Sequence, residues 1–156
     1  MIEIIAAIGP KLEIGLNGRL PWNYISEDMA HFKKHTIGKC VIMGKTTFES
    51  LNKIPLSGRT NIVMSTNEIY TGVCNVRSVK DALDTAMIKD KGIAVIGGAS
   101  VYKQFEGIAT KLVITHIPEK YISSADTYFP IDLNNWNVFN EYNITSDIIV
   151  KEYVKK

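Results

Sequence analysis

Short runs of apolar residues alternate with helix-like segments along this chain, and this alternation limits the folds it can adopt. Strands that are apolar throughout are typical of a sheet covered on both faces, and such sheets are mostly parallel. Near the C-terminus, two segments of alternating polarity flank Thr145-Ser146-Asp147 and predict an antiparallel pair that closes one edge. The pattern predicts strands at residues 2–8, 40–43, 61–64, 93–96, 111–117, 138–143 and 148–154, and helices at 27–35, 45–51, 79–88 and 99–105. In the 79–88 helix, one apolar side is formed by Val79, Leu83, Ala86 and Met87.

Two of the predicted strands end in a glycine that precedes a helix. Ligands of such sheets bind beyond the carboxyl ends of the strands. At Gly97-Gly98-Ala99 and Met43-Gly44-Lys45 the backbone can approach a ligand, and the helix N-terminus offers N–H groups to a phosphate. Neither stretch has the spacing of the six-residue dinucleotide fingerprint or of the triphosphatase loop. A tight turn explains Gly97-Gly98 equally well, but two such helix starts together favour a dinucleotide diphosphate.

An acid behind a proline–tryptophan turn is the most informative single residue. The stretch Leu20-Pro21-Trp22-Asn23 precedes a helix that Ser26 is expected to cap. On that helix Asp28, Met29 and Phe32 share one face. A carboxylate among apolar side chains is costly unless a partner pairs with it. A flat heterocycle with two N–H donors would pair with both carboxylate oxygens, while Phe32 packs on its ring.

The composition excludes several classes of protein. With 156 residues, of which 46% are hydrophobic and 22% charged, the chain is expected to form one globular domain over residues 1–156. A net charge of +2 gives no general attraction to nucleic acid or membranes. No apolar stretch of about 20 residues is present to span a bilayer. Because the N-terminus resembles a strand and not a leader, we expect a cytoplasmic protein.

The spacing of cysteine and histidine indicates no metal site. Cys40 lies in an apolar strand and is expected to be a buried thiol. His31 and His35 are one helical turn apart, a spacing that can bind a metal. Lys33 and Lys34 beside them favour a solvated helix face instead. We therefore expect no metal cofactor.

Taken in order, these motifs and several others match one family. The chain resembles the dihydrofolate reductases over essentially its whole length, because the same pieces occur in the same order. They are Ile5-Ala6-Ala7, Ile14-Gly15, Leu20-Pro21-Trp22-Asn23, Asp28 with Phe32-Lys33, the run from Val41 to Ser50, Pro55-Leu56 with Gly58-Arg59, Ile96-Gly97-Gly98 with Val101-Tyr102, Thr115-His116-Ile117, and Asp126-Thr127 with Phe129-Pro130. The resemblance implies an α/β fold, with an eight-stranded, mostly parallel sheet, four flanking helices and a C-terminal antiparallel hairpin.

The resemblance also implies a reaction and a substrate pocket. The reaction is NADPH-dependent reduction of 7,8-dihydrofolate to tetrahydrofolate, with hydride transfer to pterin C6 and protonation at N5, in support of one-carbon metabolism and thymidylate synthesis. The implied partners are dihydrofolate and antifolate inhibitors, and a monomer is the family default. Asp28 would hold the pterin, and Arg59 would bind a carboxylate of the folate tail. The other implied catalytic positions are Leu20, Trp22 and Thr115, and the pocket walls are Ile5, Ala6, Met29, Phe32, Leu51, Leu56 and Ile96.

By the same resemblance, the cofactor lies along the glycine-led turns. The 2′-phosphate of NADPH would be bound by Lys45, Ser65, Thr66 and Arg77. No acid is expected beside them, which favours NADPH over NADH. The diphosphate would lie on Thr47, Ala99 and the pair Gly97-Gly98, which is expected to have a cis peptide bond. The nicotinamide would lie near Ala7, Ile14 and Tyr102, under a mobile loop at residues 15–20. Further implied contacts are Gly15, Asn17, Gly18, Leu20, Gly44, Thr46, Ile96, Ser100 and Val101.

Departures from the family pattern leave alternatives. One extra residue between Trp22 and Asp28 makes Glu27 a rival acid, although helical phase favours Asp28. Lys45 stands where many members have arginine, and Ser100 replaces another frequent arginine. Two other functions are a pyrimidine reductase of riboflavin synthesis on the same fold and a binding module without activity. Asp28 and Arg59 argue against the first, and the filled catalytic positions argue against the second.

Overall fold

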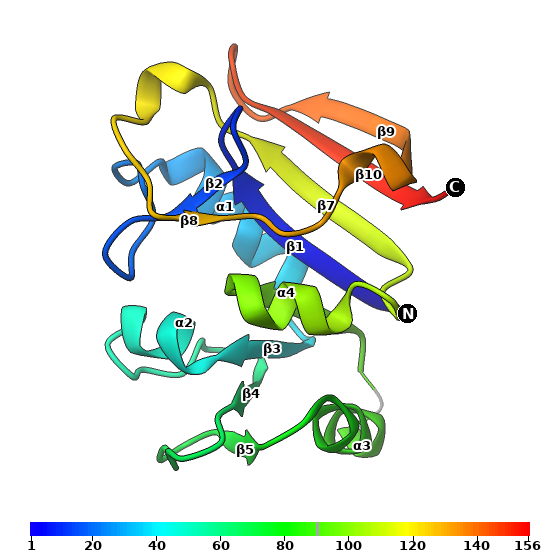
Figure 1. Cartoon of the computed structure of the whole chain (residues 1–156). Coiled ribbons are helices and arrows are strands. Elements are labelled where there is room, and N and C mark those ends of the chain that lie inside the picture. Colours follow the sequence, from blue (N-terminus) through cyan, green and yellow to red (C-terminus); the bar gives the residue numbers. More distant parts are fainter. Residues whose placement is uncertain (90) are drawn as a thin grey trace.

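The computed structural model describes residues 1–89 and 91–156. Its centre is an eight-stranded sheet in the order β5-β4-β3-β6-β1-β7-β10-β9, which runs from bottom to top in Figure 1. The strands are β1 (Ile2–Ile8), β3 (Cys40–Gly44), β4 (Thr60–Met64), β5 (Cys74–Val76), β6 (Ile93–Gly97), β7 (Lys111–His116), β9 (Trp136–Asn143) and β10 (Ile149–Lys155). The expected number of strands in the main sheet is thus confirmed.

Strand direction gives this sheet one common edge. The strands from β5 to β7 pair in parallel, whereas β10 and β9 continue the sheet antiparallel, as the C-terminal pattern predicted. Because these parallel strands run in the same direction through the twisted sheet, their carboxyl ends meet along one edge, which Figure 1 shows at the upper left for β1 and β7. This is the edge where ligands of open α/β sheets bind.

Four helices cover the two faces of the sheet. The first face carries α1 (Ser26–Thr36) and α2 (Lys45–Ser50), and the other carries α3 (Val79–Lys89) and α4 (Ala99–Phe105). Figure 1 shows α4 in front of the strands and α1 behind them. Strand side chains alternate between faces, so Ile4 and Ile8 of β1 belong to the core layer of α4, while Ile5 belongs to the layer of α1. Burial of both faces explains why β3 and β6 are apolar throughout, whereas β1 and β4 each keep one buried polar residue near their start, Glu3 and Asn61.

Several short elements have no signal in the sequence pattern. They are β5, a small separate sheet of β2 (Glu13–Gly15) and β8 (Thr127–Tyr128), and the 3₁₀ turns η1 (Glu119–Tyr121) and η2 (Leu133–Asn135). Elements of two or three residues have too few positions to show a period.

Two details of the predicted helices are wrong. Ser26 does not cap α1 but is its first residue, after Ile25, and its hydroxyl donates to Glu27 Oε1 at 3.1 Å. Met87 does not share the buried side of Ala86, because it is 73% exposed. The expected buried thiol at Cys40 is confirmed.

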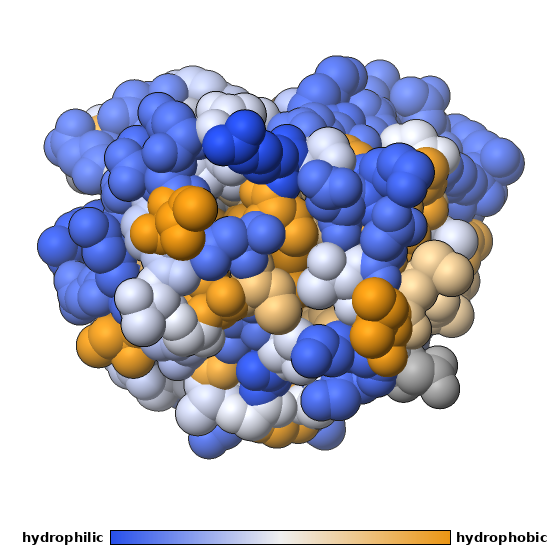
Figure 2. Space-filling view, turned by 90° about the horizontal axis from the view of Figure 1, so that it is seen from below, coloured by the Kyte–Doolittle hydropathy of each residue, from blue (hydrophilic) through white to orange (hydrophobic). Residues whose placement is uncertain are grey.

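The surface on the side of β5 and α3 is chemically mixed. Figure 2 shows this face from below, with separate hydrophobic groups among hydrophilic ones. None of the helices in the described part of the chain is long and apolar enough to cross a membrane.

Candidate active site

The residues expected to bind a cofactor follow the carboxyl ends of adjacent strands. In sheet order, Arg77 follows β5, Ser65 follows β4, Lys45 follows β3, and Gly98 follows β6, while Ala7 lies near the end of β1. Segments far apart in the sequence therefore lie side by side along one edge of the sheet (Figure 1). An extended ligand can contact all of them at once.

Glycine at two of these strand ends lets α4 pack closely against the sheet. A Cβ added at Gly44 would lie 3.0 Å from Val101 Cγ2, and one added at Gly97 would lie 3.1 Å from the Tyr102 ring. Gly97 also has a φ of +115°, which side chains of L residues rarely adopt. The Gly97–Gly98 peptide bond is cis, so this expectation is confirmed.

The first turns of α2 and α4 present backbone N–H groups at the same edge. Gly44 and Gly98 stand at the N-cap positions, and among the described residues no side chain caps either helix. The first N–H groups of a helix have no partner within the helix, and the helix dipole favours an anion there. These two turns can therefore hold a diphosphate.

Tyr102 connects α4 to the central strand. Its hydroxyl donates to the Ile5 carbonyl at 2.8 Å, and its ring packs edge-on against Phe129. Burial raises the pKa of Tyr102 well above its ordinary value, so the hydroxyl stays protonated. The bond fixes α4 relative to β1 beside Ala6 and Ala7.

Asp28 is the buried acid of the site. It lies in the first turn of α1, is only 6% exposed, and shares a hydrogen bond with the side chain of Thr115 on β7. Burial raises the pKa of Asp28 from 3.8 to about 6, against the opposing effect of the Thr115 hydrogen bond. Glu27, the rival acid, is exposed. Of the two candidate acids, Asp28 is therefore the buried one and Glu27 the exposed one.

Most of the expected pocket walls lie in one hydrophobic cluster. Ile5 packs in the same core layer as Phe32, Leu51, Leu56 and Ile96. Two walls differ from expectation. The side chain of Ala6 faces the opposite layer, because neighbouring strand residues point to opposite faces, and Met29 is 36% exposed on the outside of α1. Trp22 is buried in a third cluster with Ile117 and Ile148.

The loop at residues 15–20 is a short hairpin that is held from one side. Leu16 and Arg19 exchange backbone hydrogen bonds of 2.7 and 3.0 Å. Asn17 and Gly18 at its tip have φ values of 53° and 77°, as a type I′ turn requires. The Asn17 N–H donates to Asp126 Oδ2 at 2.9 Å, and the Asp126 N–H donates to the Gly15 carbonyl at 2.9 Å. Leu20, at the end of the loop, is 48% exposed.

Arg59 is held in a defined orientation next to α1. Its Nε donates to the Ser57 carbonyl at 2.9 Å, and its Nη1 donates to Thr36 Oγ1 at 2.9 Å. Partial burial lowers the pKa of Arg59, although the group stays charged at neutral pH. A cavity of about 490 Å³ lies beside it, lined by residues 55–61 and 72–74.

The expectation of a solvated face for His31 and His35 is wrong. Their Nε2 atoms lie 2.7 and 3.1 Å from the Tyr142 hydroxyl of β9. A hydroxyl can donate to one imidazole and accept from the other. Burial, together with a smaller effect of nearby His35, lowers the pKa of His31 to about 4.

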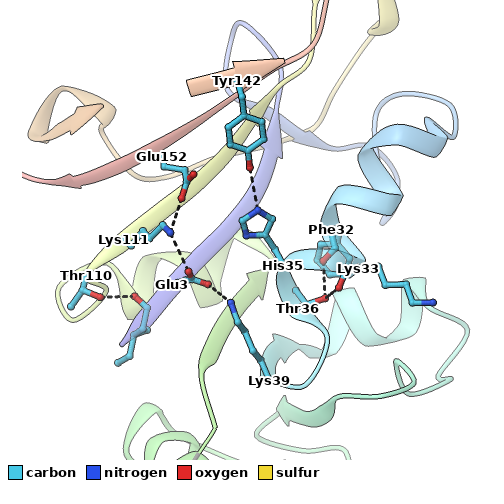
Figure 3. Close-up of polar contacts among 11 residues, drawn as sticks. Glu3, Phe32, Lys33, His35, Thr36, Lys39, Thr110, Lys111, Tyr142 and Glu152 are labelled. Atoms are coloured by element: carbon cyan, nitrogen blue, oxygen red, sulfur yellow. Dashed lines mark hydrogen bonds and ion pairs between the residues drawn. The ribbon is translucent and has the colours of Figure 1, made fainter. Parts of the chain in front are cut away.

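An ion-pair network extends from this histidine contact along the sheet. Figure 3 shows His35 against Tyr142 and, next to them, Lys111 between two carboxylates. Lys111 Nζ lies 2.6 Å from Glu152 Oε1 and 3.5 Å from Glu3 Oε1, and Lys39 Nζ lies 2.8 Å from Glu3 Oε2. Within residues 1–89 and 91–156, no group of three or more His, Cys, Asp or Glu could hold a metal ion.

The expectation that no acid lies beside Lys45 is wrong. Lys45 Nζ lies 3.6 Å from Glu68 Oε1.

Asn61 and Asp126 were also not predicted as site residues. The Asn61 side chain exchanges hydrogen bonds of 2.9 Å with both backbone groups of Leu56 and so fixes that wall of the pocket. The sequence offered one signal for Asn61, which is an asparagine near the start of an otherwise apolar strand, because a polar side chain there needs a hydrogen-bond partner.

These features define a class of enzyme. A buried carboxylate at the carboxyl edge of a parallel sheet, beside two uncapped helix starts, is typical of an enzyme that holds a flat polar ring next to a dinucleotide. The comparisons with known proteins are more specific. The family model described as "Dihydrofolate reductase" matches residues 1–153. The chain belongs to the dihydrofolate reductase family.

Individual relatives agree with this assignment. The chain is 38% identical over 161 residues to the dihydrofolate reductase of Buchnera aphidicola subsp. Acyrthosiphon pisum, covering 95% of this chain and 98% of that protein. It is 41% identical over 138 residues to that of Neisseria gonorrhoeae, covering 86% and 83% of the two chains. A solved structure of dihydrofolate reductase from Enterococcus faecalis, complexed with NADP(H) and RAB-propyl, is similar with a TM-score of 0.88 and 30% identity, over 100% of this chain and 96% of the other.

Proposed function

We propose that this chain carries out the reaction of its family, the NADPH-dependent reduction of 7,8-dihydrofolate to 5,6,7,8-tetrahydrofolate, with Asp28 as the group that binds and polarises the pterin. The observation that carries this proposal is the buried Asp28 carboxylate beside Thr115, at the same sheet edge as the two glycine-led helix starts. A pyrimidine substrate with a ribose phosphate would not require an acid in an apolar pocket.

Asp28 acts through its charge and its two acceptor oxygens. The pterin ring offers an amide N–H and an amino group side by side, which pair with one carboxylate. With a pKa of about 6, Asp28 is mostly ionised at pH 7 and favours a cationic, protonated ring. Asp28 reaches only one side of the ring, so the proton for N5 comes from a water admitted by the loop at residues 15–20. Thr115 and Trp22 position the carboxylate and a nearby water.

The sheet edge fits a dinucleotide phosphate. Gly97 is buried under Tyr102, whereas Gly98 is only half-buried and has the Thr47 hydroxyl beside it, so a diphosphate would lie at Gly98 and the first turn of α4. Lys45, Ser65, Thr66 and Arg77 would hold the 2′-phosphate. When bound, NADPH supplies the hydride. The chain's own residues hold and orient the two ligands, which is the main contribution a protein makes to such chemistry.

The remaining parts of the proposal concern the folate tail and the assembly. Arg59 would bind the α-carboxylate of the tail, since its planar group is already oriented by Ser57 and Thr36. We further propose that residues 1–156 form a single domain that works as a cytoplasmic monomer.

A spectrophotometric assay tests the proposed reaction. The protein is mixed with NADPH and 7,8-dihydrofolate, and the loss of NADPH absorbance is followed with time. We expect turnover that depends on dihydrofolate and that stops with an antifolate inhibitor. Turnover with a pyrimidine ribose phosphate but not with dihydrofolate would contradict the proposal, and so would tight binding of both ligands without turnover.

A further inference from the structure

Lys45 and Glu68 form an ion pair where β3 and β4 end. Lys45 is the first residue of α2, directly after Gly44, which lies opposite Met64 in the paired strands. Glu68 lies in the turn after β4. Its backbone N–H donates to Ser65 Oγ at 3.0 Å, so the turn is closed by one of the residues expected to bind phosphate. The side chains meet with Lys45 Nζ 3.6 Å from Glu68 Oε1.

The pair is accessible to a ligand and contributes little to the fold. The Lys45 and Glu68 side chains are 41% and 47% exposed, and ion pairs of such exposure have small effects on stability. The other carboxylate of this region, Glu49 on α2, accepts from the Tyr70 hydroxyl at 2.9 Å. Glu68 is therefore the acid whose charge is presented next to Lys45.

We propose that Glu68 sets how strongly this enzyme prefers cofactors with a 2′-phosphate, by competing with that phosphate for Lys45. The inference rests on the proposed placement of the 2′-phosphate at Lys45. A phosphate dianion that contacts Lys45 must displace or approach the Glu68 carboxylate, which lies 3.6 Å from Lys45 Nζ, and the two negative charges repel each other. The 2′-OH of NADH is neutral and can donate to a carboxylate. Glu68 therefore lowers the affinity for NADPH without lowering that for NADH.

Glu68→Gln tests this inference, because it removes the charge and keeps the shape. Dissociation constants for NADPH and NADH are measured by quenching of tryptophan fluorescence, and those for 2′,5′-ADP and 5′-AMP by calorimetry. We expect Glu68→Gln to tighten NADPH and 2′,5′-ADP about three- to tenfold and to change NADH and 5′-AMP less than twofold. The gain is expected to shrink in about 0.5 M KCl, because exposed charges are screened.

Two further variants separate the possible failures. Glu106→Gln removes the acid of another exposed pair, Lys103 Nζ to Glu106 Oε1 at 3.0 Å, at the far end of α4, and it should leave all four affinities unchanged. Lys45→Gln should weaken NADPH and 2′,5′-ADP. If it weakens them but Glu68→Gln does not tighten them, or tightens NADH equally, the role of Glu68 is wrong while the phosphate site holds. If Lys45→Gln has no effect on any ligand, the phosphate site at Lys45 and the inference are both wrong.

Discussion

Replacing Asp28 with asparagine is expected to stabilise the fold at neutral pH while it impairs the reaction. The Asp28 carboxylate is 6% exposed, and burial raises its pKa from 3.8 to about 6. A carboxyl group with a raised pKa binds its proton more tightly in the folded state than in the unfolded state. Its contribution to stability is therefore fully present below pH 3.8 and is lost as the pH rises through 6. Asparagine has no charge to desolvate and so avoids this loss.

The size of the effect follows from the pKa shift. Each pKa unit corresponds to about 1.4 kcal/mol, so a shift from 3.8 to about 6 sets an upper limit of about 3 kcal/mol above pH 7. Part of this gain is offset, because asparagine presents a weaker acceptor to Thr115 and must place a buried N–H₂ group. We expect a net gain of about 1–2 kcal/mol in the free energy of unfolding, or roughly 2–8 °C in Tm for a chain of this length.

Thermal and urea unfolding at pH 7.5 and pH 4 measure this gain. Asp28→Asn should be more stable than the wild type at pH 7.5, and the difference should vanish or reverse at pH 4. Glu27→Gln is the matched control, because the exposed neighbour has little desolvation to relieve, and its stability should match the wild type at both values. Equal stability of Asp28→Asn and wild type at pH 7.5, or a gain of the same size at pH 4, would refute the reasoning.

Three further predictions concern the tail, the loop and the buried histidines. Arg59→Lys should raise KM for dihydrofolate about 10-fold or more and leave KM for a pteridine without the glutamate tail unchanged, because lysine lacks the two-pronged contact. Asp126→Ala removes the acceptor of the Asn17 N–H and should speed tryptic cleavage at Arg19, measured by mass spectrometry, and lower kcat severalfold. Between pH 6.5 and about 4, His31 takes up a proton in the unfolded chain but not in the folded one, so falling pH favours unfolding by up to about 1.4 kcal/mol per pH unit. His31→Phe should remove this part of the fall in stability.

Each of these predictions has a clear contrary result. Equal changes for tailed and tailless substrates would place Arg59 outside the tail site. Unchanged cleavage in Asp126→Ala, relative to an Asp84→Ala control on the exposed side of α3, would show that Asp126 does not restrain the loop. An unchanged pH slope of unfolding in His31→Phe would mean that His31 is accessible to protons in the folded state.

The sequence predicts the central sheet well because its strands have a simple physical signature. A strand buried on both faces is apolar at most positions: β3 and β6 are apolar throughout, and β1 and β4 depart from this pattern only near their starts, at Glu3 and at Thr60 and Asn61. The burial of Asp28 was also predictable, because Asp28 lies one helical turn before Phe32, although Met29, which was expected on the same face, is 36% exposed. The glycines at 44 and 97 mark places where α4 approaches the strand ends too closely for a side chain.

Contacts between distant segments were not predictable from local pattern. Asn17 and Asp126 are 109 residues apart, and His31 and Tyr142 are 111 residues apart. For His31 the neighbouring lysines suggested a solvated face, but an α-helix turns about 100° per residue, so adjacent residues need not share an environment. The Glu68 pair depends on how β3 and β4 end side by side, which only the folded sheet determines.

The central claim is that Asp28 is the acid on which the reaction depends, and a pH series of kcat/KM tests it most directly. Wild type, Asp28→Asn and Glu27→Gln are assayed with dihydrofolate and saturating NADPH from pH 5 to 8. We expect Asp28→Asn to lose about 10²-fold or more at pH 7.5, the usual scale for a positioned electrostatic group. The loss should shrink as the pH falls and solvent protonates the substrate, and Glu27→Gln should stay within about twofold of the wild type. A large loss in Glu27→Gln together with a mild effect of Asp28→Asn would contradict the account and assign the role to Glu27.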